Sequence, residues 1–242
     1  MRLTLAAVLA AAIPFRALGQ EAPLTVNATI ISDYRERGLS WSGGKPAAQA
    51  GVEAPLGNDF GLAARVGSAR GAARHGGADA VVDLEVFHAG EAGLWQWHGA
   101  IVAHAFLDGE GAQDYIELDA GAGVMMGPLD LSLLVSYAPP QDSIGGSNRH
   151  GRVRTRLGLM GTPVTVAAQA GCSAGTVRNP VRAMRLRPGG SYCDWMAGAE
   201  YALGPMTFSL RYSDTDIRRR DVRNGQSAHH GAVLVAGARL AL

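Results

Sequence analysis

The stretch YIELDAGAGVMMGPLDLSLLVSY, residues 115–137, alternates apolar and polar side chains on both sides of a Gly-Pro pair. In its first half, apolar residues at even positions oppose Glu117 and Asp119. In its second half, apolar residues at odd positions oppose Asp130 and Ser136. Alternation over such a length predicts β-strands with one apolar face, and a Gly-Pro pair between two strands predicts a tight turn. The stretch therefore predicts an antiparallel hairpin with one apolar and one polar face.

The same alternation recurs in twelve segments from residue 24 to residue 242. They lie within residues 24–38, 48–54, 60–67, 82–86, 94–107, 115–126, 129–137, 152–159, 164–170, 194–201, 206–212 and 234–242. Short turns are expected at residues 57–58, 90–91, 127–128, 161–163 and 204–205, and longer polar loops near residues 39–46, 70–78, 108–114, 138–150, 172–192 and 214–228. Short and long connections alternate strictly, which is typical of bacterial outer-membrane barrels with short periplasmic turns and longer extracellular loops.

We therefore expect an all-β fold, a transmembrane antiparallel up-and-down β-barrel of about 12 strands. An even number of strands would place both termini in the periplasm. The expected location is the outer membrane of a Gram-negative bacterium.

The first 19 residues, MRLTLAAVLAAAIPFRALG, have the features of a secretory signal peptide. A basic residue precedes an apolar run, residues 3–15, that is too short to cross a bilayer as a helix, and Ala17-Leu18-Gly19 resembles a cleavage site. An uncleaved anchor is the alternative, which Pro14 disfavours because it truncates the run. We expect residues 1–19 to be a cleaved signal peptide and residues 20–242 to form one barrel domain.

Aromatic residues on the apolar faces lie near the ends of the segments. Tyr34, Tyr137, Trp195 and Tyr212 are next to long loops, and Phe60, Trp95, Trp97, Tyr201 and Phe208 are next to short turns. Two aromatic girdles around an aliphatic band are expected for a barrel in lipid. A rival interpretation is a membrane helix over residues 157–177, which are uncharged. Gly161-Thr162-Pro163 and the continued alternation favour a hairpin there instead.

Composition limits the partners and the redox chemistry. The formal net charge is +1, so there is no electrostatic case for nucleic-acid binding. Cys172 and Cys193 fall at the outer ends of neighbouring predicted strands, and an exported chain allows a disulfide to persist. We expect a Cys172–Cys193 bond that ties down the loop between them. That loop carries Arg178, Arg182, Arg185 and Arg187.

The polar faces place charged residues inside the expected barrel, where they would line the pore. The basic ones are Arg35, Arg37, Arg65, Arg152, Arg154, Arg156, Arg211 and Arg239. The acidic ones are Asp33, Glu53, Asp83, Glu85, Glu117, Asp119 and Glu200. Their order along the chain predicts one acidic and one basic wall, with Arg65 paired to Asp83 or Glu85. Charged lumen rings set ion preference, and the basic residues near the mouth predict a weak preference for anions. The alternative is that these charges form salt bridges that only hold the barrel's shape.

The stretch SDYRERGLSWSGGKPAAQAGVE, residues 32–53, resembles the start of the TorF-like porins, a bacterial family. That family begins with a Ser-Asp-Tyr-Arg-x-Arg-Gly strand, followed by a return strand with a Pro-Ala-x-Gln-x-Gly pattern. The matching residues are Ser32, Asp33, Tyr34, Arg35, Arg37, Gly38, Pro46, Ala47, Gln49 and Gly51. Family members usually end in an aromatic residue, whereas this sequence ends in Leu242. The resemblance implies an outer-membrane barrel with a porin-like function and leaves the solute undefined.

The expected function is a porin-like channel for passive diffusion of small polar or charged solutes. The expected partners are outer-membrane lipid, those solutes, and the outer-membrane assembly machinery, which would contact the C-terminal strand. A non-conducting scaffold barrel is an alternative, because lumenal side chains could plug the barrel.

An outer-membrane lipid hydrolase is a further alternative. It needs a serine and a histidine within hydrogen-bond reach, for which Ser136 and His150 are candidates. Ser136 is expected to face the lumen and no third partner is indicated, so we expect no catalytic residues and no enzyme activity.

The histidines do not predict a metal site. His75, His229 and His230 are expected in loops that lack a nearby set of cysteines or carboxylates. His98 and His104 are expected to face the lumen. No metal and no cofactor is implied.

Overall fold

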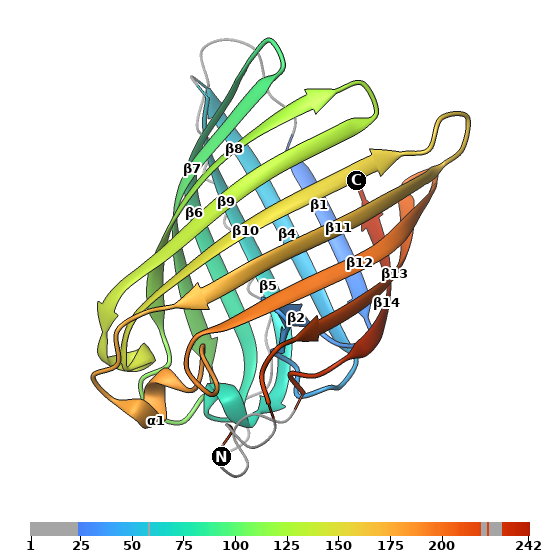
Figure 1. Cartoon of the computed structure of the whole chain (residues 1–242). Helices are drawn as coiled ribbons and strands as arrows, with labels where there is room; N and C mark the ends of the chain where they lie inside the picture. The colour runs from blue at the N-terminus through green and yellow to red at the C-terminus, as the bar shows by residue number, and fades with distance from the viewer. Residues whose placement is uncertain (1–23, 58, 219–221, 223–228) are drawn as a thin grey trace.

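The structure, a computed structural model, describes residues 24–57, 59–218, 222 and 229–242. The expected signal peptide, residues 1–19, lies outside the described residues. In the described part of the chain, twelve strands form one closed antiparallel barrel (Figure 1). The sequence therefore predicted the fold class and the number of barrel strands correctly.

The elements are as follows. The barrel strands are β1 (Thr25–Ile31), β4 (Ala47–Gly57), β5 (Phe60–Ala72), β6 (Ala78–Ala92), β7 (Trp95–Leu107), β8 (Tyr115–Met126), β9 (Leu129–Gln141), β10 (Gly146–Gly158), β11 (Val164–Ala174), β12 (Tyr192–Leu203), β13 (Met206–Thr215) and β14 (Val233–Ala241). Two short strands, β2 (Arg35–Glu36) and β3 (Leu39–Ser40), pair only with each other. Short helical turns are η1 (Ala73–His75), η2 (Asp142–Ile144) and α1 (Pro180–Ala183).

Each barrel strand pairs with its neighbours in chain order, and β14 closes the ring by pairing with β1, where Ala241 lies opposite Asn27. A closed ladder leaves no open strand edge, so the backbone groups of the wall can pair with neighbouring strands even in lipid. The barrel begins and ends at the same rim, where the Leu242 N–H donates to the Val26 carbonyl at 2.9 Å. We call this rim, with its tight turns, the short-turn end, and the opposite rim the long-loop end.

The outer face of the barrel is apolar and exposed. Ile30 is 70% exposed, Leu84 53% and Leu210 55%, and similar side chains follow one another around the ring. A water-soluble protein rarely exposes so continuous an apolar surface, whereas a barrel in lipid requires it. The exposed aromatics include Tyr137, Trp195 and Tyr212 near the long-loop end, and Phe60, Trp95, Trp97, Tyr201 and Phe208 near the short-turn end. The chain is thus an outer-membrane type of barrel with lipid-facing aromatics near both rims.

The rival helix over residues 157–177 is wrong, because these residues contribute to β10 and β11 and the turn between them. No helix in the described part of the chain has the length and apolar character needed to span a membrane.

Two connections lie elsewhere than the sequence suggested. Strand β6 continues to Ala92, so the turn before β7 is at residues 93–94 rather than 90–91, and Gly93 takes the left-handed conformation with φ +62°. Strands β9 and β10 extend through most of residues 138–150 and leave only residues 142–145 as their connection. Strands that project beyond the lipid band need no apolar outer face there, so alternation alone underestimates their length.

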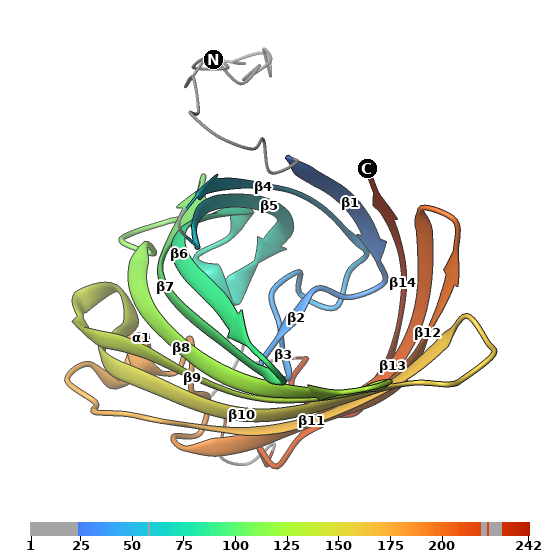
Figure 2. The ribbon, with the colours of Figure 1, turned by 90° about the horizontal axis from the view of Figure 1, so that it is seen from above.

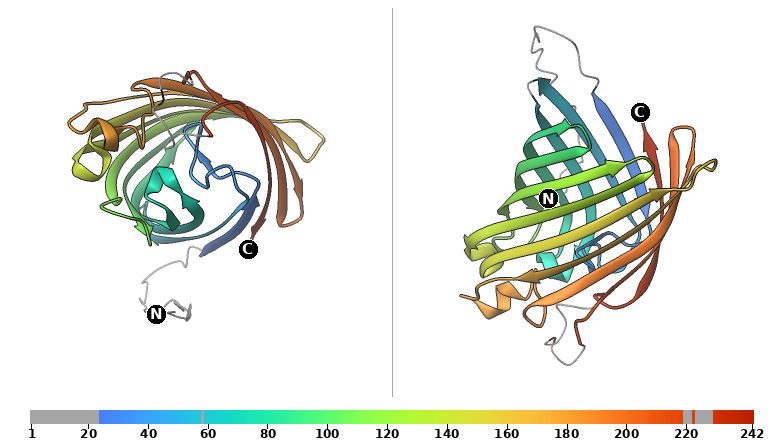
Figure 3. Two further views of the ribbon diagram at one scale, coloured as in Figure 1. Left: turned by 90° about the horizontal axis from the view of Figure 1, so that it is seen from below. Right: turned by 45° about the horizontal axis from the view of Figure 1, so that its top comes forward.

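The first segment differs most from expectation, because β1 ends at Ile31 instead of continuing to residue 38. The chain then turns inward, and residues 32–46, which we call the lumen segment, run inside the ring before β4 begins (Figure 2, Figure 3). Tyr34 was expected to belong to the lipid-facing aromatic girdle, and this is wrong, since its side chain is 3% exposed and packs on Trp41. The prediction assumed that an unbroken alternation of side chains means an unbroken strand. Here Arg37 at φ 52° and Gly38 at φ 75° both take the left-handed conformation and close a hairpin instead.

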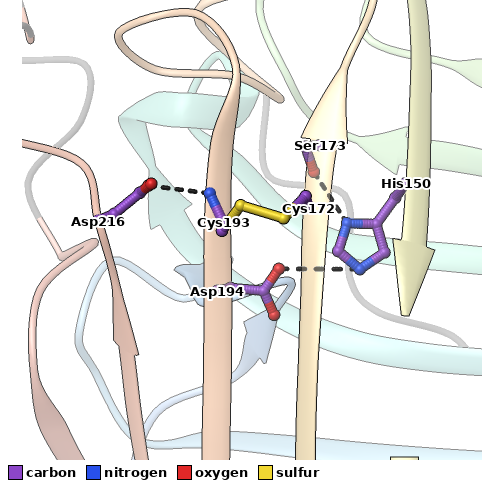
Figure 4. Close-up of a disulfide and its surroundings, with 6 residues drawn as sticks. All are labelled: His150, Cys172, Ser173, Cys193, Asp194 and Asp216. Carbon is purple, nitrogen blue, oxygen red and sulfur yellow. Dashed lines mark hydrogen bonds and ion pairs between the residues drawn. A yellow bond between two sulfur atoms is a disulfide. The ribbon is translucent and has the colours of Figure 1, made fainter. Parts of the chain in front are cut away.

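The predicted disulfide is confirmed. Cys172 of β11 and Cys193 of β12 are directly opposite each other, with 4.0 Å between their Cα atoms (Figure 4). Both belong to the outward-facing residues of their strands, close to the long-loop end. The bond closes the loop of residues 175–191, which contains α1.

Candidate functional site

The lumen segment is held inside the barrel by a compact polar turn. Arg35 Nε donates to Asp33 Oδ2 at 2.7 Å, and Ser40 Oγ donates to Asp33 Oδ1 at 2.5 Å. Ser42 Oγ accepts from the Tyr34 N–H at 3.0 Å and thereby fixes the return of the chain. Asp33 and Arg35 were expected to project from a wall strand into open lumen. They instead neutralise each other within this turn.

Aromatic packing fills the space between the lumen segment and the wall. Trp41 is 5% exposed and contacts four rings, those of Tyr34, His75, His104 and Phe106, with centroids 4.8 to 6.0 Å away. Buried aromatic contact of this kind is a large stabilising term. The sequence contained a signal for it, since Trp41 is a large aromatic inside an otherwise small and polar loop, but its partners come from distant strands.

Arg37 crosses the lumen to the acidic wall. Its Nη2 donates to Glu117 Oε2 of β8 at 2.6 Å, and its carbonyl accepts from the Tyr192 hydroxyl at 3.0 Å. Glu117 is only 3% exposed, so this charge-assisted pair lies in a largely desolvated setting. The pair therefore fixes the tip of the hairpin to β8.

The acidic wall is formed by β6 and β8, as the sequence predicted. His104 Nδ1 lies 2.7 Å from Asp83 Oδ1, and His98 Nε2 lies 3.2 Å from Glu85 Oε1. Arg65 Nη1 is 3.7 Å from Asp83 Oδ2, which confirms the expected pairing of Arg65. His98 and His104 both lie on the inward parity of β7, as expected.

The basic wall follows β10 and β13. Arg156 Nη2 and Arg211 Nη2 both donate to Glu200 of β12, at 2.9 and 2.8 Å. Arg152 and Arg154, on the same face of β10, have no hydrogen bond or ion pair with any other described residue. The basic wall therefore combines ion pairs to Glu200 with two arginines left without a carboxylate partner among the described residues.

The remaining predicted lumenal charges lie near the short-turn end. Glu53 of β4 and Arg239 of β14 belong to the inward-facing set of residues on their strands, and their side chains are exposed to solvent. The predicted lumenal residues do not come from one ring of strands: Asp33, Arg35 and Arg37 belong to the lumen segment and the others to the wall strands.

Cavities remain between the lumen segment and the wall. The one we call the central chamber has about 290 Å³ and is bounded by Trp41, Glu117, Asp119, Arg152 and Leu186, among others. A neighbouring cavity of about 210 Å³ lies between the lumen segment and the basic wall, where Arg154 and Arg211 line it. The space inside the barrel therefore contains cavities that charged and aromatic side chains line together.

The loop of residues 175–191 covers the long-loop end with buried arginines. Arg185 lies over the Phe106 ring at 4.3 Å and its Nε donates to His75 Nδ1 at 3.2 Å. Arg74 Nη1 donates to the Arg185 carbonyl, and Arg187 donates to three backbone carbonyls. Burial lowers the pKa of both Arg74 and Arg185 to about 10, so both stay charged at neutral pH. Of the four loop arginines, Arg178 and Arg182 remain exposed.

His75, expected to be a solvated loop residue, is fully buried, and this expectation is corrected. Burial, and then the charge of Arg185, lower the pKa of His75 well below its usual value. The ring is therefore neutral and can accept from Arg185. The described residues include no group of three or more His, Cys, Asp or Glu side chains placed to hold a metal ion.

A Ser-His-Asp contact lies beside the disulfide (Figure 4). His150 Nδ1 is 2.9 Å from Ser173 Oγ, and His150 Nε2 is 3.7 Å from Asp194 Oδ2. The histidine partner is thus Ser173 of β11 rather than Ser136, which the sequence suggested. All three side chains are at most 2% exposed, so the hydroxyl has no open approach for a lipid ester. The contact is consistent with a buried polar link across β10, β11 and β12.

Solved structures share the fold. The KdgM porin in complex with disordered oligogalacturonate is 6% identical, with a TM-score of 0.56 over 90% of this chain and 97% of that one. An outer-membrane channel from Pseudomonas putida F1 is 9% identical, with a TM-score of 0.54 over 93% of this chain and 96% of that one. At such identities the likeness shows the fold alone.

A search of curated proteins finds no significant match. Residues 18–236 match a family described as bacterial protein of unknown function, Gcw_chp. This description does not confirm the resemblance of the opening stretch to TorF-like porins. Since the match spans almost the entire chain, this twelve-stranded barrel belongs to the bacterial Gcw_chp family.

Proposed function

We propose that the protein is a porin-like outer-membrane channel through which small polar or charged solutes diffuse passively along a charged lumen. The observation that carries the proposal is the unpaired state of Arg152 and Arg154, which face polar cavities in the lumen and have no carboxylate partner among the described residues. A lumen that served only to hold the barrel's shape would be expected to neutralise its buried charges. The resemblance of residues 32–51 to TorF-like porins supports the same function.

The membrane orientation is part of this proposal. The short-turn end, where both barrel termini meet, would face the periplasm, and the long loops would face the cell surface. The C-terminal strand β14 keeps its apolar outward alternation, with Leu234 64% exposed, and would be the element that contacts the assembly machinery.

Reversal potentials in a salt gradient test the charged lumen. We expect weak anion preference in the wild type and a shift toward cations in the variant with Arg152→Gln and Arg154→Gln, because these arginines are unpaired. The shift should grow at low salt, where screening is weaker. Arg156→Gln is the matched control, because Arg156 is already bound to Glu200 and its loss should change selectivity less. An unchanged reversal potential in a conducting double variant would contradict a role of these residues in selectivity.

The second candidate function is a non-conducting scaffold barrel, which the position of the lumen segment favours. Single-channel recording on the purified protein separates the two. A channel shows discrete conductance steps in the wild type. A scaffold shows none, and conduction would appear only after residues 33–44 are replaced by a short Gly-Ser linker.

A further inference from the structure

The central chamber contains carboxylate oxygens that lack partners. Glu117 Oε1 and Asp119 Oδ1 are buried atoms without a hydrogen-bond partner among the described residues, although Glu117 Oε2 is bound to Arg37 and the Asp119 carboxylate also interacts with Ser136. The two side chains are two positions apart on β8, so they project from the same face, and both line the chamber. Folded proteins rarely leave buried acceptors unsatisfied, and Glu117 is only 3% exposed. The pair is arranged to accept from a ligand that carries several N–H donors.

A cation without a partner lines the same chamber. Arg152 has no hydrogen bond or ion pair with a described residue, and it lies on β10, which is separated from β8 by β9. Neighbouring strands are about 4.8 Å apart, so the backbones of β8 and β10 are roughly 10 Å apart. That span suits a small molecule with one hydrogen-bonded charge at each end.

The remaining walls limit the size and nature of the ligand. Tyr34, Trp41, Tyr115 and Tyr192 supply aromatic surface, which favours an ammonium group through its contact with ring faces. The chamber is also lined by Glu36 and by charged side chains that already have partners, namely Arg37, Arg65, Asp83, Glu85, His98 and His104. The volume of about 290 Å³ holds roughly ten water molecules at about 30 Å³ each, which corresponds to a solute of about ten non-hydrogen atoms.

We propose that the central chamber binds a small zwitterion of the amino-acid class. Its ammonium group contacts Glu117 and Asp119, and its carboxylate contacts Arg152. A simple anion is disfavoured by the two carboxylates and a simple cation by Arg152, because discrimination comes from repulsion as well as attraction. The proposal rests on the proposed function only in making the bound solute the transported one.

Binding can be measured without conduction. The folded protein in detergent is titrated with three probes: L-glutamine, its N-acetyl derivative, which is an anion, and its α-amide, which is a cation. Isothermal titration is combined with tryptophan fluorescence, because Trp41 lines the chamber whereas Trp95, Trp97 and Trp195 are on the outer face. We expect L-glutamine to bind at least about tenfold more tightly than either derivative, the difference expected for one lost charged hydrogen bond. The fluorescence change should disappear in Trp41→Phe.

Variants on β8 and β10 separately test the contacts proposed for the ammonium group and for the carboxylate of the ligand. Asp119→Asn should weaken binding of L-glutamine about tenfold, and Arg152→Gln should do the same and remove its advantage over the α-amide. Glu53→Gln and Arg239→Gln, exposed lumenal charges near the short-turn end, are the matched controls and should leave affinity unchanged. Glu117 is not the first choice for substitution, because it also holds Arg37. The mobility of unboiled protein in a gel verifies that each variant is folded.

Equal binding of the three probes, or no saturable binding of L-glutamine, would overturn the inference. Binding of Mg²⁺ alone by Asp119 and Glu117, without any dependence on Arg152, would also overturn it. Zwitterion binding in a protein that never conducts would uphold this inference and refute the proposed channel. Conduction without zwitterion binding would refute this inference and uphold the proposed channel.

Discussion

At the scale of single residues, the Arg37–Glu117 ion pair decides how firmly the lumen segment is held. Arg37→Gln leaves the Glu117 carboxylate buried without its guanidinium partner. Removing one partner of a buried ion pair costs about 3 kcal/mol of stability. The temperature at which half of the protein loses its folded band in a gel should therefore fall. The conductance of the variant should rise, because the hairpin tip is released.

The matched control for this substitution is the double variant with Arg37→Gln and Glu117→Gln. It removes both charges and should be less destabilised than the sum of the two single variants. Strict additivity of the single variants would show that the two side chains are not coupled.

His75 provides a pH-sensitive contact. Its pKa is lowered by burial and then by Arg185, so the ring is neutral in the folded state, while an unfolded histidine titrates near about 6.5. Between these two values the unfolded or opened state binds more protons, so stability falls as pH decreases below about 6.5. We expect the protection factors of residues 175–191, which correct hydrogen exchange for its intrinsic pH dependence, to fall as the pH is lowered through that window. His75→Gln keeps an acceptor for Arg185 without titrating, and should lose this pH dependence.

At the scale of elements, the loop of residues 175–191 has two kinds of anchor. The arginines fix it from inside, and the Cys172–Cys193 bond fixes its base on the outer face. The sequence separation of the cysteines is 21 residues, for which chain entropy gives about 3 kcal/mol. The disulfide should contribute less than this to the free energy of unfolding, because the hydrogen bonds between β11 and β12 already hold the two strands together.

We therefore predict that reduction leaves the barrel folded and makes the loop more sensitive to protease. Cys172→Ser with Cys193→Ser should lower the thermal midpoint only modestly and leave conductance unchanged, because both side chains face outward. Loss of the folded gel form on reduction would show instead that the bond is needed for the barrel itself.

At the scale of the whole molecule, the apolar outer face and closed ladder require a bilayer or detergent. The chain should fractionate with outer membranes and migrate differently before and after boiling. In intact cells, a tag inserted after Gly189 in the long loop should be reached by protease, and a tag at the short turn near Gly204 should not. The opposite pattern would reverse the proposed orientation, and recovery as a soluble protein without detergent would contradict the membrane location.

Much of the barrel could be predicted from alternation alone. In lipid the outward residues must be apolar and the wall must close, so a period of two identifies the strands, their facing and their even number. For the same reason parity placed Arg152, Glu117 and Asp119 inside, and paired the two cysteines at the rim. Turn positions were less accurate, as at residues 90–94, because strands can extend past the lipid band without a change in pattern.

What only the tertiary structure decided is the content of the lumen. Residues 32–38 keep the alternation of a strand, yet they leave the wall. Tyr34 packs on Trp41, and Trp41 and Arg37 gain Phe106 and Glu117 from strands farther along the chain. Such contacts join residues up to 80 positions apart and have no local signature. The sequence by itself thus determined that a closed barrel forms, while long-range packing decided which of the predicted lumenal charges are paired.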